Sequence, residues 1–335
     1  MKKICIRVPN WLGDAVMALP SIRCLHRSFQ GDELWLAGPD WILDLYRRQN
    51  FAAHCLFTPS TNSAREQVAT TVRIREIGFD SVLFLTNSFR SVLPFFRART
   101  PERCGYNRDG RFVLLSRGVR PPGFLPPLHQ VNEYLHLLSR LSFPVGESRV
   151  FLDVPDSDRA DADEILKRRG VDRDGPLVAL SPGAFYGMTK QWPNSKFSEL
   201  GRLFQERDDA RICIVGSSRE KEPAEEIVRS LPRMAVNLAG ETNLPQLAAL
   251  IKLCRLFISN DSGPMHLANA VGTPVVSIFG PTDERRTGPF QQPSAVVKKQ
   301  APCGPCLYRT CPYDHRCMND ITAEDVYSIG RTFLP

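Results

Sequence analysis

Short apolar runs alternate with longer amphipathic runs along this chain of 335 residues. In the first half, the apolar runs at residues 3–8, 34–37 and 81–85 have the length and composition of buried strands. Residues 15–29 carry apolar positions at helical spacing, and we expect Pro20 to kink that helix. This strand–helix–strand order predicts a parallel sheet covered by helices on both faces.

The same rhythm restarts in the second half, after a break rich in proline and glycine that places an interdomain linker within residues 145–175. The predicted strands and helices of this half are, in chain order, 177–180, 196–205, 211–215, 244–254, 256–259 and 273–279. Thr322 and Asp325 form the pattern of a capping box that opens a last helix. The chain is therefore expected to be an α/β protein with Rossmann-like domains at 1–160 and 170–320 and a C-terminal helix at 321–335.

Composition narrows the class of protein. Hydrophobic residues make up 42% and charged residues 24%, which is ordinary for a globular protein, and no apolar run reaches the length of a membrane span. Arg7 interrupts the first apolar run too early for a signal peptide, so the expected location is the cytoplasm. The glycine patterns of dinucleotide-binding and P-loop proteins are absent, which argues against a dehydrogenase or a P-loop ATPase.

The positive charge lies in the first half of the chain. Residues 1–150 hold 20 Lys and Arg against 12 Asp and Glu, a net +8, whereas the remainder has a net charge of −1. Eight arginines gather between residues 90 and 120: Arg90, Arg97, Arg99, Arg103, Arg108, Arg111, Arg117 and Arg120. Guanidinium groups bind phosphate and carboxylate bidentately, so this segment indicates an anionic partner; a solvated surface is the alternative.

Residues 260–266 are the most informative stretch, because a polar turn there joins an apolar strand to a helix start. A helix start exposes unpaired backbone N–H groups and the positive end of the dipole, both of which attract phosphate. Gly263 allows a close approach of the backbone, and Ser262 offers a hydrogen bond. The pattern predicts a nucleotide-diphosphate pocket, with an ordinary capped helix as the alternative.

Asp14 follows the first strand at its carboxyl end, where ligands of such sheets bind. A carboxylate there can act as a general base toward a hydroxyl, and Gly13 beside it suggests a tight turn. The alternative is that Asp14 caps the following helix.

Two further loops follow strands of the second half. Residues 181–193 combine glycines with Lys190, which can neutralise a departing diphosphate or can be surface lysine; Trp192 is expected to pack in the core. Residues 216–222 carry Glu220 and Glu222, either of which can accept hydrogen bonds from ribose, and acidic residues in a first turn also stabilise a helix without ligand.

Five blocks, at residues 9–14, 181–193, 237–242, 260–266 and 278–282, together resemble the ADP-heptose–lipopolysaccharide heptosyltransferase family, most closely its heptosyltransferase II branch. The resemblance implies a GT-B fold, in which two Rossmann-like domains with parallel sheets face a central cleft. It implies an inverting, metal-independent mechanism that needs no cofactor.

In this resemblance Asp14 matches the family's catalytic aspartate, and Lys190 matches its diphosphate-binding lysine. The segment 185–189 departs from the heptosyltransferase I pattern, which puts side-chain phosphate contacts from Phe185 and Tyr186 in doubt. The expected substrate-binding residues are Gly13, Ser181, Gly183, Thr189, Glu220, Thr242, Asp261, Ser262, Gly263 and His266.

The implied donor is ADP-L-glycero-β-D-manno-heptose, and the implied acceptor is lipid A–Kdo–heptose of the lipopolysaccharide inner core. Such an acceptor implies peripheral contact with the cytoplasmic face of the inner membrane. A different GT-B nucleotide-sugar transferase or a nucleotide-sugar epimerase is the alternative enzyme. A basic nucleic-acid-binding protein is disfavoured, because the chain lacks a clustered basic helix or an aromatic RNA motif. The acceptor heptose that is extended, the arginines that bind it and the oligomeric state stay open.

Four of the ten cysteines, Cys303, Cys306, Cys311 and Cys317, lie within 15 residues, with His315 among them. These residue types and spacings are compatible with zinc or an iron–sulfur cluster. The spacing matches no standard zinc finger, and the implied chemistry needs no metal. Reduced or disulfide-paired thiols are therefore the expectation, with a structural metal as the alternative.

Overall fold

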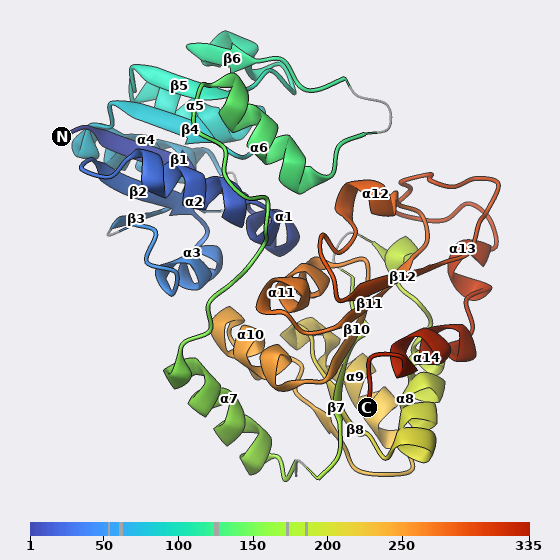
Figure 1. Cartoon of the computed structure of the whole chain (residues 1–335). Helices are drawn as coiled ribbons and strands as arrows, with labels where there is room; N and C mark the ends of the chain where they lie inside the picture. The colour runs from blue at the N-terminus through green and yellow to red at the C-terminus, as the bar shows by residue number, and fades with distance from the viewer. Residues whose placement is uncertain (53, 60–62, 124–126, 172–173, 185–186) are drawn as a thin grey trace. The chain divides into compact units, whose positions relative to one another are not determined.

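The computed structural model describes residues 1–52, 54–59, 63–123, 127–171, 174–184 and 187–335. The chain divides into two compact units, Met1–Val150 and Phe151–Pro335, each built around its own parallel sheet (Figure 1). The predicted α/β class with two parallel sheets is confirmed. Within the described residues, no helix is both long enough and apolar enough to cross a bilayer.

The first unit has a six-stranded sheet in the order β3-β2-β1-β4-β5-β6, with all neighbouring strands parallel. Its strands are β1 (Lys3–Arg7), β2 (Glu33–Gly38), β3 (His54–Phe57), β4 (Ser81–Phe84), β5 (Glu102–Tyr106) and β6 (Arg117–Val119). Its helices are α1 (Leu12–Met17), α2 (Leu19–Ser28), α3 (Asp40–Arg47), α4 (Ala64–Ile77), α5 (Phe89–Arg97), the 3-10 turn η1 (Arg111–Leu114) and α6 (Gln130–Arg140). Helices α1 and α2 pack with α6, and α4 packs with α5.

The helix expected at residues 15–29 is two helices, α1 and α2, rather than one kinked helix. Ala18 separates them, and Pro20 lies in the first turn of α2. Proline is tolerated there because the first N–H groups of a helix have no partner within it. The break ends α1 after six residues, three positions beyond Asp14.

The second unit has the sheet order β12-β11-β10-β7-β8-β9, again parallel throughout. Its strands are β7 (Leu177–Ser181), β8 (Arg211–Ile214), β9 (Ala235–Asn237), β10 (Leu256–Asn260), β11 (Val275–Phe279) and β12 (Ser294–Lys298). Its helices are α7 (Asp156–Arg168), α8 (Asn194–Asp208), α9 (Lys221–Arg229), α10 (Leu244–Leu253), α11 (Gly263–Val271), α12 (Glu284–Thr287), α13 (Arg316–Asn319) and α14 (Ala323–Arg331), with 3-10 turns η2 (Met188–Lys190) and η3 (Ser218–Glu220).

Aromatic side chains of α8, of α14 and of the loop just before α8 pack in the core of this unit. Trp192 and Phe197 meet edge to face, and Phe204 lies against Tyr327. The buried indole of Trp192 donates a hydrogen bond of 3.0 Å to the Ile321 carbonyl, so the expected packing role of this tryptophan is confirmed. This bond gives the indole N–H a hydrogen-bond acceptor in place of the water that burial excludes.

The segment expected to link the domains contains a helix. Helix α7 lies within residues 145–175 and packs against α10 of the second unit. The Leu152 amide donates to the Ala270 carbonyl at 3.0 Å, which joins the chain just before α7 to the end of α11. Residues from Phe151 onward therefore belong to the second unit.

Candidate functional site

Asp14 lies in the first turn of α1, directly after the carboxyl end of β1, and is half-buried. Trp11 is the N-cap residue of α1 and makes no side-chain cap bond, and Asp14 is an acidic residue of the first turn, where a negative charge favours the helix start. Gly13 lies inside α1 rather than in a tight turn.

Two buried tyrosines surround this part of α1. The Tyr46 hydroxyl donates to the Ala15 carbonyl at 2.7 Å. Burial raises the pKa of Tyr46 and of Tyr134, and the negative charge of Asp14 raises both further. The Asp14 carboxylate thus lies close enough to two buried phenols to affect their ionisation.

The loop that leads from β1 to α1 is held by Arg7, which sequence reasoning missed. The Arg7 guanidinium is buried, and burial lowers its pKa to about 10. It donates to the carbonyls of Val8 and Ala37 and, at 2.7 Å, to the Asn10 side chain. The bonds to Val8 and Asn10 hold the loop six and four residues before Asp14.

In the second unit, Asn260 joins two loops at the carboxyl edge of the sheet. Its buried side chain donates to the Pro182 carbonyl at 2.6 Å and accepts from the Trp192 amide at 3.1 Å. The β7–α8 loop, which carries Lys190, is thereby attached to the end of β10. Asn260 was part of the recognised motif, but its bonding role could not be predicted from it.

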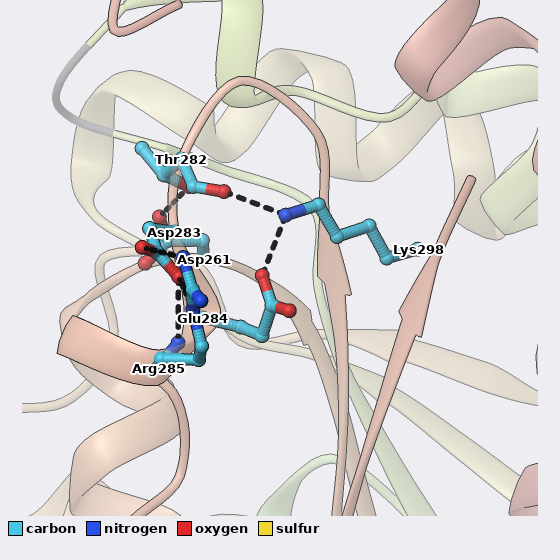
Figure 2. A network of polar contacts seen from close by, with 6 residues as sticks. All are labelled: Asp261, Thr282, Asp283, Glu284, Arg285 and Lys298. Carbon is cyan, nitrogen blue, oxygen red and sulfur yellow. Dashed lines mark hydrogen bonds and ion pairs between the residues drawn. The ribbon is translucent and has the colours of Figure 1, made fainter. Parts of the chain in front are cut away.

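Lys190 and Asp261 form a largely buried ion pair, with 2.5 Å between the Lys190 Nζ and the Asp261 carboxylate. The two side chains are 14% and 5% exposed. The Thr282 hydroxyl donates to the same carboxylate at 2.6 Å. Figure 2 shows how Lys298 continues this network, since its ammonium group donates to the Thr282 carbonyl at 3.1 Å and to Glu284.

Ser262 and Gly263 start helix α11, as the sequence predicts, with Ser262 as the N-cap residue. The Ser262 side chain makes no cap bond, and its buried hydroxyl has no hydrogen-bond partner in the described part of the chain. Pro264 has no N–H, and the Met265 amide donates to the Ser262 carbonyl at 3.2 Å, so the Gly263 amide and the Ser262 hydroxyl are the groups that can donate to an anionic oxygen at this helix start. Lys190 and this helix start therefore flank Asp261 from two loops.

Glu220 and Glu222, the two alternatives for a ribose contact, differ in their surroundings. The Glu220 carboxylate accepts hydrogen bonds from the Ser217 amide, at 2.5 Å, and from the Ser217 hydroxyl, at 2.8 Å. A Cβ added to Gly183 would lie 1.3 Å from the Glu220 carboxylate, so any other residue at 183 would require that side chain to move. Glu222 is exposed on α9.

The other expected substrate-binding residues occupy the same carboxyl edge or its neighbourhood. Ser181 is the buried last residue of β7, and Thr189 is buried in η2. His266 is a buried residue of α11, whereas Thr242 is half-buried just before α10. Phe185 and Tyr186 lie outside the described residues.

Only some arginines of residues 90–120 are exposed. Arg111 is fully buried and donates to the carbonyls of Tyr106 and Thr86. Arg108 pairs with buried Glu133, and Arg103 donates to the Leu114 carbonyl at 2.7 Å. These three guanidinium groups hold the first unit together. The exposed members are Arg90, Arg97, Arg99, Arg117 and Arg120.

The four C-terminal cysteines and His315 line one cavity. All four thiols are free, and no three His, Cys, Asp or Glu side chains among the described residues are arranged to hold a metal ion. Burial raises the pKa of Cys317, and the neighbouring thiols of Cys303, Cys306 and Cys311 raise it further.

Comparison with known proteins identifies the family. The model of glycosyltransferase family 9 (heptosyltransferase) matches residues 68–316. Lipooligosaccharide heptosyltransferase 2 of Haemophilus ducreyi is 30% identical over 321 residues, which cover 88% of each chain. The enzyme of that name from Campylobacter jejuni (serotype O:2) is 29% identical over 347 residues, covering 99% of this chain and 98% of its own.

Solved structures confirm the GT-B architecture. The Escherichia coli ADP-heptose LPS heptosyltransferase II has a TM-score of 0.82 at 25% identity, covering 99% of this chain and 98% of its own. The E. coli heptosyltransferase WaaC with ADP has a TM-score of 0.71 at 18% identity, covering 99% of both chains, and shows the fold alone. The chain belongs to glycosyltransferase family 9, and the protein is a heptosyltransferase.

Proposed function

We propose that this heptosyltransferase transfers L-glycero-D-manno-heptose from ADP-heptose to the inner core of lipopolysaccharide, with inversion and without a metal ion. The names of its relatives, lipooligosaccharide and lipopolysaccharide heptosyltransferase 2, support the heptose and the acceptor. The observation that carries the proposal is the Lys190–Asp261 pair beside the Ser262 hydroxyl, which has no hydrogen-bond partner among the residues that the structure describes.

The donor's diphosphate binds, in this proposal, between Lys190 and the start of α11. Lys190 is paired with the carboxylate of Asp261, which Thr282 also contacts. An arriving diphosphate offers the ammonium group a second anionic partner, and the Ser262 hydroxyl gains its missing one. A helix start contributes about 0.3–1 kcal/mol toward a nearby negative charge, so Lys190 supplies the larger share of the electrostatic stabilisation.

Asp14 serves as the general base. It accepts the proton of an acceptor hydroxyl while the hydroxyl oxygen attacks the anomeric carbon of the heptose. The new carbon–oxygen bond forms as the bond to ADP breaks on the opposite face, so the configuration inverts. The electron pair leaves on the β-phosphate, where Lys190 and the start of α11 stabilise it. General-base help contributes about 10²–10⁴-fold, and positioning of the two substrates supplies much of the remainder.

The lipid A–Kdo–heptose acceptor brings negative charge to the first unit. The exposed arginines of residues 90–120, a group that includes Arg90 and Arg117, are suited to its phosphates and carboxylates. Their charge also favours peripheral contact with an anionic membrane surface on the cytoplasmic side. Gly13, Ser181, Gly183, Thr242 and His266 complete the proposed substrate contacts, and Glu220 is the proposed ribose contact.

A donor and acceptor panel tests this proposal. We expect the purified protein to add one heptose to mono-heptosylated core lipid with ADP-heptose, as detected by mass spectrometry of the product. Chelation with EDTA should leave the rate unchanged, and the new linkage should have the anomeric configuration opposite to that of the donor. Transfer from UDP-sugars in preference to ADP-heptose, or conversion of the donor without an acceptor, would support another transferase or an epimerase instead.

A further inference from the structure

The cysteine-rich segment (residues 303–317) is hydrogen-bonded to two loops at the carboxyl edge of the second sheet. The amides of Cys306 and Leu307 donate to the Pro281 carbonyl at 3.0 and 3.1 Å. Pro281 immediately precedes Thr282, whose hydroxyl contacts Asp261. The segment thus reaches the ion-pair network from the side of β11.

The same segment holds Thr189 in η2 at two points. The Thr189 hydroxyl donates to the Tyr308 carbonyl at 2.5 Å. The Thr189 carbonyl lies 2.7 Å from Nε2 of His315. A carbonyl oxygen only accepts, so Nε2 of His315 carries a proton and donates it. Thr189 is 3% exposed, so neither bond is easily replaced by water.

The turn around Thr189 has little room to move. A Cβ added to Gly187 would lie 2.8 Å from the Arg309 carbonyl, which shows that the segment also packs tightly against the residue before η2. Lys190 follows Thr189 directly, and its flexible side chain reaches Asp261 from this backbone position. The place from which the ammonium group extends is therefore set by contacts of Thr189 and Gly187 with residues 308–315.

We propose that His315 is a positioning residue, which fixes Lys190 for the donor's diphosphate by holding the backbone carbonyl of Thr189. The inference rests on the diphosphate-binding role proposed above for Lys190. It assigns a function to the cysteine-rich segment as the part of the second unit that keeps the diphosphate loop in place. Loss of the His315 bond frees η2 and reduces the affinity for phosphate charge, while the nucleoside contacts stay as they are.

The backbone of His315 decides which substitutions are informative. His315 has a φ of +56°, in the left-handed region, which asparagine tolerates better than most residues. In His315→Asn the amide is too short to place a donor at the position of Nε2. In His315→Gln the side-chain amide reaches that position, so this variant keeps the bond to Thr189.

NMR titrations with ADP and with adenosine distinguish the contacts to the diphosphate from the contacts to the nucleoside. We expect His315→Asn to weaken ADP binding about tenfold, the scale of one buried hydrogen bond, and to leave adenosine binding unchanged. His315→Gln should stay within about threefold of the wild type for both ligands. Thr189→Val, which removes the bond to Tyr308, should weaken ADP selectively as well.

Equal weakening of ADP and adenosine in His315→Asn, or no weakening of either, would overturn the inference. If His315→Asn does not fold, His315→Gly, which suits the positive φ and also lacks a side-chain donor, decides by the same comparison. A failure of the proposed donor site shows differently: Lys190→Met would then bind ADP as tightly as the wild type, whatever the His315 variants do.

Discussion

At the scale of single residues, Lys190 of the second unit forms an ion pair with the buried carboxylate of Asp261. The Lys190 ammonium and the Asp261 carboxylate are both largely buried, and Thr282 adds a hydrogen bond to the carboxylate. Removing one partner of such a pair leaves an uncompensated buried charge, which costs more than the pair itself contributes. Lys190 therefore affects both the stability of this edge and, in our proposal, the binding of phosphate.

The variant Lys190→Met tests the phosphate role. We expect it to raise the KM for ADP-heptose and the Kd for ADP by about 10–100-fold, because one charge-assisted bond to the diphosphate is lost. Steady-state kinetics and ADP titration measure both quantities. Lys299→Met is the matched control, because Lys299 also pairs with an aspartate, Asp325, but in a more exposed ion pair, with side chains 42% and 32% exposed. Equal effects in the two variants would contradict the assignment.

At the scale of elements, helix α14 begins with a complete capping box. The Asp325 amide donates to the Thr322 hydroxyl at 3.0 Å, and the Thr322 amide donates to the Asp325 carboxylate at 2.9 Å. Backbone hydrogen bonding in pairs of this kind satisfies the first amides of the helix. Because α14 packs against α8 over the aromatic core, its start contributes to the stability of the second unit.

Thr322→Ala should lower the free energy of unfolding of the second unit by about 1 kcal/mol, the usual cost of an N-cap threonine. Urea denaturation followed by tryptophan fluorescence reports it, since Trp192 lies in this core. Thr332→Ala, at the exposed end of the same helix, should change stability by less than about 0.5 kcal/mol. An unchanged midpoint in Thr322→Ala would mean that the cap bonds add nothing to the packed helix.

Local patterns predicted the central elements but not the bonds between them. The capping box follows from residues three positions apart, and apolar runs predicted β1, β2, β4, β7, β8, β10 and β11. The strands β3, β5, β6, β9 and β12 were not predicted. The break at Ala18 was missed because proline in a first turn and proline within a helix look alike in sequence. The contacts of Asn260 with Pro182 and of His315 with Thr189 span 78 and 126 residues, and no local pattern encodes them.

In the candidate site too, the sequence predicted single residues but not the contacts between distant ones. Asp14, Lys190 and the turn at Ser262 were found because each follows a strand at its carboxyl end. Thr282 belonged to a recognised block, yet its bond to Asp261 depends on the order of β10 and β11 in the sheet. Lys298 had no signal in the sequence, because a single lysine in a strand is most often solvated.

At the scale of the whole molecule, the two units divide the proposed chemistry. The donor-site residues all belong to Phe151–Pro335, whereas Asp14 belongs to Met1–Val150. A ligand that binds the native state stabilises it by about 2.7 kcal/mol at a concentration of 100 times its Kd. We expect ADP to slow hydrogen exchange around Lys190 and at the start of α11, as read by mass spectrometry. Unchanged exchange in both places at saturating ADP would contradict the proposed donor site.

The most direct test of the proposed general base measures heptose transfer and ADP binding in the isosteric variant Asp14→Asn. Product formation from ADP-heptose and mono-heptosylated core lipid should fall by at least about 100-fold, the lower bound of what a general base contributes. The Kd for ADP should remain that of the wild type, because no donor-site residue has changed. Near-normal turnover in Asp14→Asn would contradict the central claim that this carboxylate accepts the proton of the attacking hydroxyl.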